Sequence, residues 1–470
     1  MMKNRWVIVT TFSMYAISAV NALSLQEGMD EVLNTNPIVQ ERLHNYRVTL
    51  EDLRTTEAQY LPTLDYTGTI AREKTNSPST SFKTISLNSY EHSLQLTQNL
   101  FNGFGTTYES DYNKARILAA AYNYVENAND VAFNFTTAYI NALKSRDIMF
   151  VAQSNVQYND DIAIKVQKLF NAGLTTRSEG EKADTSLSLA KSNFVVAQNN
   201  LDDALFNLER IYGKKVAPEE LQGLSFSGEL PDSIEEMREY AQLHNPSILV
   251  NDYNIKAAQA QKSLAQKGYY PTIDAFARKS LGNNIGGLTG DDDRFKIGLN
   301  LSYNLYRGGA DESQIHKSLS KINQESEMKR DSIRKLDEQG SLSWSAKKNL
   351  ADQIVHLKRY EISSKRTLEL YQKEYDLGRR TLLDLLTAQS DHVSAQTQII
   401  RAENDLMLAH YRILDSMGTM VPSILGTQES DLIARVGLKS LDNRIDNNER
   451  IENLIFADRK IDKYKREVEK

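Results

Sequence analysis

The stretch YDLGRRTLLDLLTAQ, at residues 375–389, has a counterpart 205 positions earlier, FNAGLTTRSEGEKAD at residues 170–184. In both stretches a long helical pattern stops at a glycine, Gly378 in one and Gly173 in the other. Glycine readily adopts the left-handed conformation that ends many helices. Each stretch therefore predicts the end of one helix and a tight turn into the next.

A capping signal follows each of these glycines. Thr381 is followed three residues later by Asp384, and Thr176 is followed by Glu179. A Thr-x-x-acid run is typical of a capping box, in which the threonine and the acid satisfy free backbone amides at the start of a helix. We therefore expect two helix-turn-helix tips, and their repetition predicts an internally duplicated chain.

The duplication extends beyond the tips. The pair Asn36-Pro37 matches Asn245-Pro246 at an offset of 209 residues, whereas Gly213 matches Gly418 at an offset of 205. The two halves therefore differ by a net indel of four residues. Because exposed loops tolerate insertions and packed elements do not, we expect a surface loop in that interval.

The composition excludes several classes of function. The chain has 470 residues, a net charge of −6 and no cysteine, so disulfides, thiolate metal sites and a lipid anchor on cysteine are excluded. Nothing in the charge pattern suggests binding to nucleic acid. The histidines form no His-Glu-x-x-His motif, and neither a P-loop nor a Gly-x-Ser-x-Gly motif occurs. We expect no catalytic residues, no metal site and no cofactor, and hence no enzyme.

The first residues have the features of a signal peptide. Lys3 and Arg5 precede an apolar run at residues 6–20, and small residues occupy the positions before a cleavage site at Ala22. We therefore expect a signal peptide at residues 1–22 and a mature chain that begins at Leu23. The alternative is an uncleaved anchor helix.

Four segments alternate apolar and polar residues with a period of two, as strands do. They lie at about residues 63–72, 89–101, 272–280 and 294–306. Their length is close to the roughly 9–11 residues of a tilted transmembrane strand. Four strands cannot close a barrel, which needs about eight, so a membrane location requires an oligomer. The alternative is a pair of soluble hairpins covered by helices.

Between the strands lie very long helical patterns. Residues 104–171 and 309–376 contain no proline, and at 1.5 Å per residue each predicts a helix on the order of 100 Å long. Residues 176–212 and 381–417 supply the returning helices, and their apolar residues step by three and four, which is typical of a coiled-coil seam. The first seam contains Leu187, Ala190, Phe194, Ala197, Leu201, Ala204, Leu208 and Ile211.

These patterns give the expected organisation of the chain. A first repeat at residues 23–212 has its tip at 171–179, and a second repeat at 233–418 has its tip at 376–384. A polar linker at 213–232 separates them, and a charged tail at 419–470, partly disordered, follows.

Several ordered motifs together resemble the TolC-like outer-membrane efflux family. These motifs are Asn-Pro before the first helix of each half, Pro-Thr-Leu/Ile-Asp at the entry to the strands, Leu-Phe-Asn-Gly and Leu-Tyr-Arg-Gly-Gly at their exit, and the tip at residues 375–389. The resemblance covers nearly all of the chain from Leu23 to about Gly418. It implies an α+β membrane protein with a long antiparallel coiled-coil tunnel and four transmembrane strands per protomer.

The resemblance also implies an assembly, a location and partners. A homotrimer would form a twelve-strand β-barrel in the Gram-negative outer membrane and a twelve-helix α-barrel in the periplasm. A periplasmic adaptor would connect it to an inner-membrane transporter, either an ABC transporter or a proton-driven pump. Outer-membrane lipid would surround the strands.

A periplasmic gate is implied at the tips. In the family, an arginine and a tyrosine hold neighbouring helices closed and acids ring the narrowest point; the matching residues are Arg380, Tyr375 and Asp384, with Glu179 as the acid of the first tip. A second acid expected three residues after Asp384 is replaced by Thr387, which implies a weaker negative constriction. The alternative roles are purely local: Arg380 could pair with Asp384 four residues later, and both acids could serve only as helix caps.

The adaptor is expected to dock on the same tips. Gly173 and Leu174 match the family's Gly-Leu contact, whereas the second tip has Gly378 followed by Arg379. The second tip therefore departs from the family pattern at its adaptor contact.

The expected function is that of a passive exit duct. The absence of a lipidated cysteine and the amino-acid sequence of the tip favour type I secretion of a polypeptide, such as a large adhesin or an RTX-type protein. Efflux of small molecules is the main alternative. A soluble periplasmic coiled-coil scaffold is a third possibility, which the four amphipathic strands disfavour.

Overall fold

The computed structural model describes residues 23–426 except residue 227. The expected signal peptide and residues 427–470 of the expected tail lie outside the described residues. The helices are α1 (Leu25–Thr35), α2 (Pro37–Glu57), α3 (Gly105–Asn171), α4 (Arg177–Tyr212), α5 (Ile234–His244), α6 (Pro246–Ala265), α7 (Ala310–Asp376), α8 (Leu382–Met417) and α9 (Met420–Leu425). The strands are β1 (Thr63–Thr75), β2 (Ile85–Phe101), β3 (Thr272–Asn283) and β4 (Asp291–Ser302).

The chain divides into two compact units. The first comprises the described residues up to Val32 together with residues 135–226 and 353–405. The second comprises the remaining described residues and contains the whole sheet. Helices α1, α3, α7 and α8 contribute residues to both units. No helix among the described residues is both long enough and apolar enough to cross a membrane.

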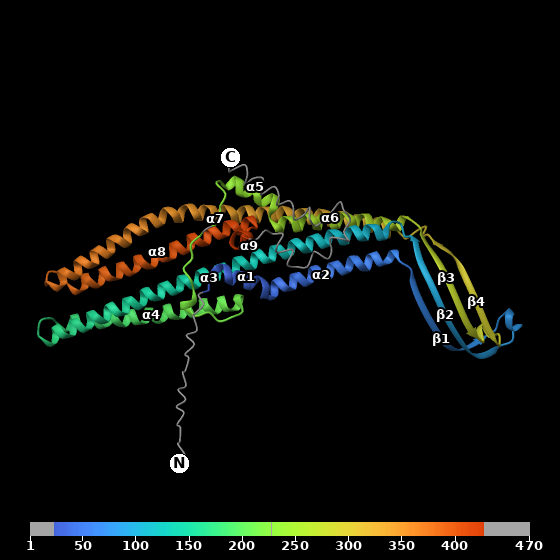
Figure 1. Ribbon diagram of the computed structural model, residues 1–470, viewed down its shortest axis with the longest axis horizontal. Coiled ribbons are helices and arrows are strands. Elements are labelled where there is room, and N and C mark those ends of the chain that lie inside the picture. Colours follow the sequence, from blue (N-terminus) through green and yellow to red (C-terminus); the bar gives the residue numbers. More distant parts are fainter. Residues whose placement is uncertain (1–22, 227, 427–470) are drawn as a thin grey trace, which may run out of the picture. The chain divides into compact units, whose positions relative to one another are not determined.

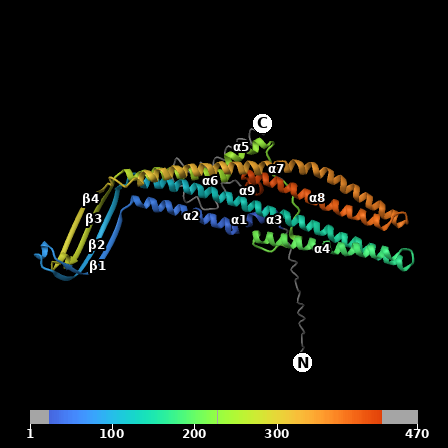
Figure 2. The ribbon, with the colours of Figure 1, turned by 180° about the vertical axis from the view of Figure 1, so that it is seen from behind.

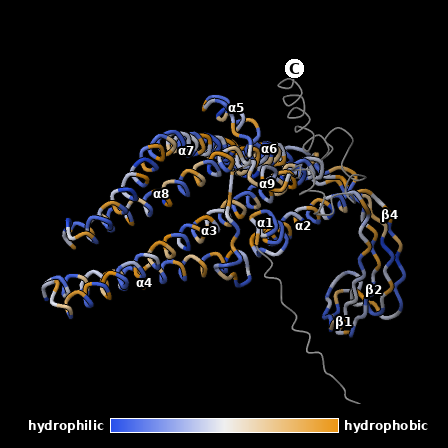
Figure 3. The backbone as a smooth tube through the Cα atoms, turned by 60° about the vertical axis from the view of Figure 1, so that its left-hand side comes forward, coloured by the Kyte–Doolittle hydropathy of each residue, from blue (hydrophilic) through white to orange (hydrophobic). Residues whose placement is uncertain are grey.

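The sheet of the second unit is antiparallel, with strand order β1-β2-β3-β4 (Figures 1 and 2). Across residues 64–67 of β1, the rows of directly opposed residues are alternately mainly apolar and mainly polar, and successive rows lie on opposite faces. One row contains Leu64, Leu96, Ala277 and Ile297. The next row, on the other face, contains Asp65, Gln95, Arg278 and Lys296. The alternation of hydropathy along the strands is visible in Figure 3.

The strand ends differ from the expected ones. β4 begins at Asp291 and ends at Ser302, whereas we expected residues 294–306. The Asn283 amide donates to the Asp291 carboxylate at 2.8 Å, so the acidic run continues the hairpin instead of forming a loop. At the other end, the side chain of Asn304 accepts a hydrogen bond from the Tyr306 backbone amide at 3.1 Å. This bond forms a local turn, so the backbone stops pairing with β3 after Ser302.

Matching caps begin the corresponding helices of the two repeats. The Asn36 side chain accepts from the Ile38 amide at 2.9 Å, and the Asn245 side chain accepts from the Ser247 amide at the same distance. A proline follows each asparagine, at the first helical position, where its missing N–H costs nothing. The repeated Asn-Pro motif is therefore a repeated helix start.

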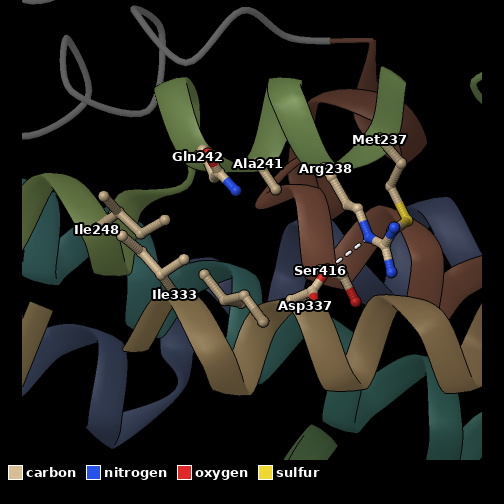
Figure 4. A pocket seen from close by; sticks show the side chains of 9 residues that line it. Met237, Arg238, Ala241, Gln242, Ile248, Ile333, Asp337 and Ser416 are labelled. Carbon is tan, nitrogen blue, oxygen red and sulfur yellow. Dashed lines mark ion pairs between the residues drawn. The ribbon is translucent and has the colours of Figure 1, made fainter. Parts of the chain in front are cut away.

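Helix α5 is clamped against α7 in the second unit. Arg238 of α5 forms an ion pair with Asp337 of α7 (Figure 4). Arg238 also donates to the Ser341 hydroxyl at 2.9 Å. Met237 packs beside Gly340, where an added Cβ would lie 2.4 Å from the methionine methyl group. The small pocket drawn in Figure 4 lies under this clamp, and its apolar lining includes Ala241, Ile248 and Ile333.

In the first unit, the segment that begins the described chain joins the linker. Leu23 forms a parallel bridge with Leu221, and its amide donates to the Glu220 carbonyl at 2.8 Å. The hydroxyl of Tyr139, which is fully buried on α3, donates to the carbonyl of Leu23 at 2.8 Å. The expected polar linker thus includes an ordered part that packs on α3.

Candidate functional site: the two hairpin tips

The second tip is closed by a glycine turn and a side-chain cap. Gly378 has a φ of 70°, and its amide donates to the Tyr375 carbonyl at 2.9 Å. The Asp384 amide donates to the Thr381 hydroxyl at 3.2 Å, and that hydroxyl donates to the Asp384 carboxylate at 2.8 Å. The expected capping box at this tip is confirmed.

The first tip has the same turn but a different cap. Gly173 has a φ of 72°, and its amide donates to the Phe170 carbonyl at 2.9 Å. Thr176, however, makes no side-chain cap, and the Glu179 carboxylate accepts from the hydroxyl of Thr175 instead. The expected capping box is therefore wrong here. Residue 175 supplies a hydroxyl within reach of the acid, whereas the matching residue of the second tip is an arginine.

An apolar cluster joins the first hairpin, α3 and α4, to the second hairpin, α7 and α8. All its members belong to the first unit, and they lie within a few turns of the tips. The buried members are Ile162, Val166, Ala183, Leu368, Leu382, Leu385 and Ala388. Tyr158, Ala163, Tyr371, Tyr375 and Leu386 are partly buried against them. The two hairpins are thus held together by burial of apolar surface, the main favourable term in such contacts.

Tyr375 lies where the two hairpins meet. Its ring packs on the apolar cluster, and the ammonium of Lys165 lies 5.7 Å from the ring centroid. Burial raises the pKa of the Tyr375 hydroxyl, and the negative charges of Glu179 and Asp376 raise it further. The acid of the first tip therefore acts electrostatically on the tyrosine of the second.

Polar contacts cross between the hairpins beside Tyr375. Lys165 of α3 forms an ion pair with Asp376 at the end of α7. Further from the tip, two turns before Lys165 on α3, the hydroxyl of Tyr158 donates to Gln372 of α7 at 2.8 Å. Burial, with a contribution from the charge of Asp376, raises the pKa of Tyr158 to about 12, so this hydroxyl remains a donor at any physiological pH.

Arg380 binds within its own hairpin. Its Nε donates to Glu374 at 2.8 Å, and its guanidinium lies 4.1 Å from the ring centroid of Tyr371. Both partners belong to α7. The pair with Asp384 that the spacing allows is not the ion pair observed, because the Asp384 carboxylate is engaged by Thr381. Arg380 therefore ties the turn before α8 back to α7.

The residues expected to contact an adaptor are open to solvent. Leu174 is 74% exposed, and Gly173, Gly378 and Arg379 are exposed as well. An added Cβ at either glycine would meet no atom within 4 Å. These positions therefore have room for a contact from outside the chain.

A family model decides the relationship of the chain to known proteins. The model for "outer membrane efflux protein" matches residues 28–214 and 238–419, which include both hairpins and the whole sheet. The chain belongs to the outer membrane efflux protein family. It is therefore a protein of the Gram-negative outer membrane with a helical part in the periplasm, and not the soluble scaffold that the sequence left open.

Three relatives of this efflux protein have similar lengths. The outer membrane efflux protein BepC of Brucella suis biovar 1 (strain 1330) is 25% identical, covering 84% of this chain and 85% of BepC. The outer membrane protein TolC of Escherichia coli (strain K12) is 24% identical over 89% of this chain and 86% of TolC. The alkaline protease secretion protein AprF of Pseudomonas aeruginosa is 24% identical over 83% and 84%.

The fold of this efflux protein is also that of solved outer-membrane channels. The crystal structure of the Campylobacter jejuni CmeC outer membrane channel superposes with a TM-score of 0.76, at 16% identity, over 88% of this chain and 89% of that one. The expected fold class, a helical tunnel element with four strands, is thereby confirmed for the protomer.

Several residues at the tips of this efflux protein were not predicted from the sequence. Lys165, Asp376 and Gln372 make the polar contacts between hairpins, and Glu374 and Tyr371 hold Arg380. A helical period reveals which residues share a face, but not which face of a helix in one repeat meets the other repeat. Among the described residues, no group of three or more acidic or histidine side chains is placed to hold a metal ion.

Proposed function

We propose that three copies of this efflux protein form a passive exit channel of a tripartite export system. The channel would carry a substrate from an inner-membrane transporter and a periplasmic adaptor to the outside of the cell. The observation that carries the proposal is the sheet, whose apolar side chains are exposed in the single chain. Leu64, Ile70, Phe295 and Ile297 are 64–77% exposed.

The edges of the sheet require further copies of the chain. β1 and β4 each pair with one strand only, so each leaves one row of backbone groups without a partner strand in the sheet. Such edges are not tolerated in lipid, where no water satisfies them. Pairing β4 of one copy with β1 of the next removes the edges, and three copies supply twelve strands, above the minimum of about eight. The same symmetry would surround the tunnel with twelve helices.

The gate of this channel is proposed at the hairpin tips. Contacts within each protomer, through the apolar cluster and the Lys165–Asp376 ion pair, support a state in which the two hairpins are held together. Opening would separate them. Tyr375 and Arg380 are proposed to hold the closed state, and Glu179 and Asp384 to contribute negative charge at the constriction. The absence of an acid at Thr387 would weaken that charge.

The exposed tips are the proposed contact for the periplasmic adaptor. Leu174 offers an exposed apolar side chain beside Gly173, where an apolar surface of the adaptor would bind. Arg379 replaces the apolar residue at the second tip, so the adaptor contact there would be polar. This difference predicts that the adaptor distinguishes the two tips.

The proposed cargo is a polypeptide handled by type I secretion, with an ABC transporter as the energy source. The relative AprF is named for secretion of alkaline protease, whereas BepC is named as an efflux protein. These names point to both classes of cargo. The preference for a polypeptide cargo therefore rests on the chain itself, which lacks cysteine and hence a lipid anchor on cysteine. Small-molecule efflux through a proton-driven pump is the second candidate.

Deletion of the gene tests the assignment. We would compare the secreted proteins and the drug susceptibility of the deletion strain with those of the parent and of a complemented strain. Loss of one large secreted or surface protein with unchanged susceptibility supports type I secretion and identifies the cargo. Drug hypersensitivity with intact secretion would instead support the efflux function.

A further inference from the structure

A second group of polar contacts joins the hairpins further from the tips. On α3, the amide group of Asn159 donates to the carbonyl of Asn155 at 2.8 Å and to its side-chain oxygen at 3.0 Å. Ser186 of α4 donates to the side-chain oxygen of Asn159 at 2.7 Å. Gln389 of α8 donates to the side-chain oxygen of Asn155 at 3.1 Å. We call these four residues, which come from three helices, the polar node.

Two residues of the polar node, Asn159 and Gln389, are buried next to the apolar cluster, whereas Asn155 and Ser186 are partly exposed. Asn159 is 3% exposed and Gln389 is 7% exposed. Gln389 directly follows Ala388 of the cluster, and Asn159 precedes Ile162 by three residues. Among the described residues, no group donates to the side-chain oxygen of Gln389. A buried amide that is only partly satisfied lowers stability relative to an apolar side chain of the same shape.

Three of the four residues form a fixed acceptor on the first hairpin. Asn155 and Asn159 are one turn apart on α3, and Ser186 secures Asn159 from α4. Gln389 is the member that comes from the second hairpin, and within the described part of the chain its side chain donates to Asn155 alone. The contact between Asn155 and Gln389 is thus the point at which the polar node crosses from one hairpin to the other.

We propose that Gln389 is a positioning residue that sets the axial register of α8 against α3. Apolar seams of alanine and leucine repeat along both hairpins, so a slide by one helical turn, about 5.4 Å, would bury similar surface. A slide away from the tips would bring Gln389 opposite Val151, which has no side-chain acceptor, and a slide toward them would bring it opposite Asn159, whose side-chain oxygen already accepts from Ser186. Single polar residues in coiled-coil cores are known to fix register at some loss of stability. The ion pair between Lys165 and Asp376 is a weaker constraint, since the two side chains are 40% and 45% exposed and exchange readily with water.

The inference rests on the proposed function in one respect: a fixed register would give the proposed closed gate a single arrangement of its two tips. Gln389→Met separates register from stability, because methionine has a similar volume and no polar group to bury. If Gln389 sets the register, the distance between the two tips should become less uniform in this variant. Its melting temperature should at the same time rise, by on the order of 2 °C. A side chain that only fills space would show neither change.

The distance between the tips measures register directly. The chain has no cysteine, so spin labels can be placed at Ala172→Cys and Leu377→Cys, both exposed at the tips. Labelled protein is diluted with unlabelled protein so that only distances within one chain contribute. We expect one narrow distance distribution for the labelled parent, and a broadened or double distribution for Gln389→Met.

Two further variants complete the test. Gln398→Met makes the same change at an exposed position of α8, where the side chain bonds only to Ser394 of its own helix, and it should retain the narrow distribution. Asn155→Leu removes the acceptor from the opposite helix and should broaden it. An unchanged distribution in both Gln389→Met and Asn155→Leu overturns the inference. This readout requires no pore, so a failure to conduct ions in bilayers would count against the channel proposal alone.

Discussion

Asp415 is the basis of a quantitative prediction about stability and pH. It lies in the last turn of α8 in the second unit, where the helix dipole already disfavours negative charge. Burial, followed by the charge of Asp130, raises the pKa of its carboxyl to about 7, against the lowering effects of a hydrogen bond from Gln339 and the charge of Arg412. Burial and the charge of Glu126 raise the pKa of Asp130 itself, to about 6.

The sign follows from which state binds the proton. Between its ordinary pKa of 3.8 and about 7, Asp415 is protonated in the folded chain and ionised in the unfolded one. Stability is therefore greatest below this interval and falls as pH rises through it. At 1.36 kcal/mol per pH unit, the loss between pH 5 and pH 8 is about 3 kcal/mol per protomer. The Asp130 residue is exposed to solvent, which screens its charge, so its contribution is left out of this figure.

Asp415→Asn should abolish most of this loss. Asparagine cannot ionise and still accepts the Gln339 hydrogen bond, so the variant is expected to gain stability at pH 8 and little at pH 5. Guanidinium unfolding of the mature protein, followed by the emission of Trp344 in the same unit, measures both. Asp391→Asn, at an exposed position of α8, is the matched control. Equal shifts of the unfolding midpoint at the two pH values would refute the reasoning.

Three further predictions concern the tips and the repeat. Arg380→Ser removes the Glu374 bond and the stacking on α7, so leak conductance in planar bilayers should rise several-fold, whereas Arg379→Ser, at an exposed position, should leave it unchanged. Thr387→Asp adds an acid to the proposed constriction and should increase block by a multivalent cation, measured as a lower blocking concentration. Gly418→Ala should lower the melting temperature more than Gly213→Ala. Both glycines have a positive φ, which costs roughly 1–2 kcal/mol for alanine, but only at Gly418 would the new Cβ collide, 2.3 Å from a proline ring.

The duplication was readable from the sequence because its markers are backbone requirements. The glycines of the two tips adopt positive φ values of 72° and 70°, and the Asn-Pro pairs begin helices in the same way in both repeats. Such positions tolerate few other residues. They therefore persist in both halves even where the surrounding sequence has diverged.

The caps show where this reading fails. The same Thr-x-x-acid run makes a capping box at Thr381 but not at Thr176, because Thr175 offers the acid another hydroxyl. A local pattern predicts that a partner is within reach. It does not decide between two partners that are equally near.

The contacts between hairpins lay beyond the sequence for a different reason. Asn155 and Gln389 are separated by 234 residues, and Lys165 and Asp376 by 211. Each is an ordinary polar residue on a helix, and the helical period does not reveal which turn of the other hairpin it faces. Only the fold brings these residues together.

The central claim is that cargo passes between tips that the two hairpins hold closed. Lys165→Cys combined with Asp376→Cys places a disulfide where the ion pair now joins the hairpins, in a chain with no other cysteine. With the disulfide verified by mass spectrometry, export of the cargo identified from the deletion strain should stop, and it should return on addition of a reductant, while each single-cysteine variant exports normally. Export that continues unchanged with the disulfide formed would contradict the claim.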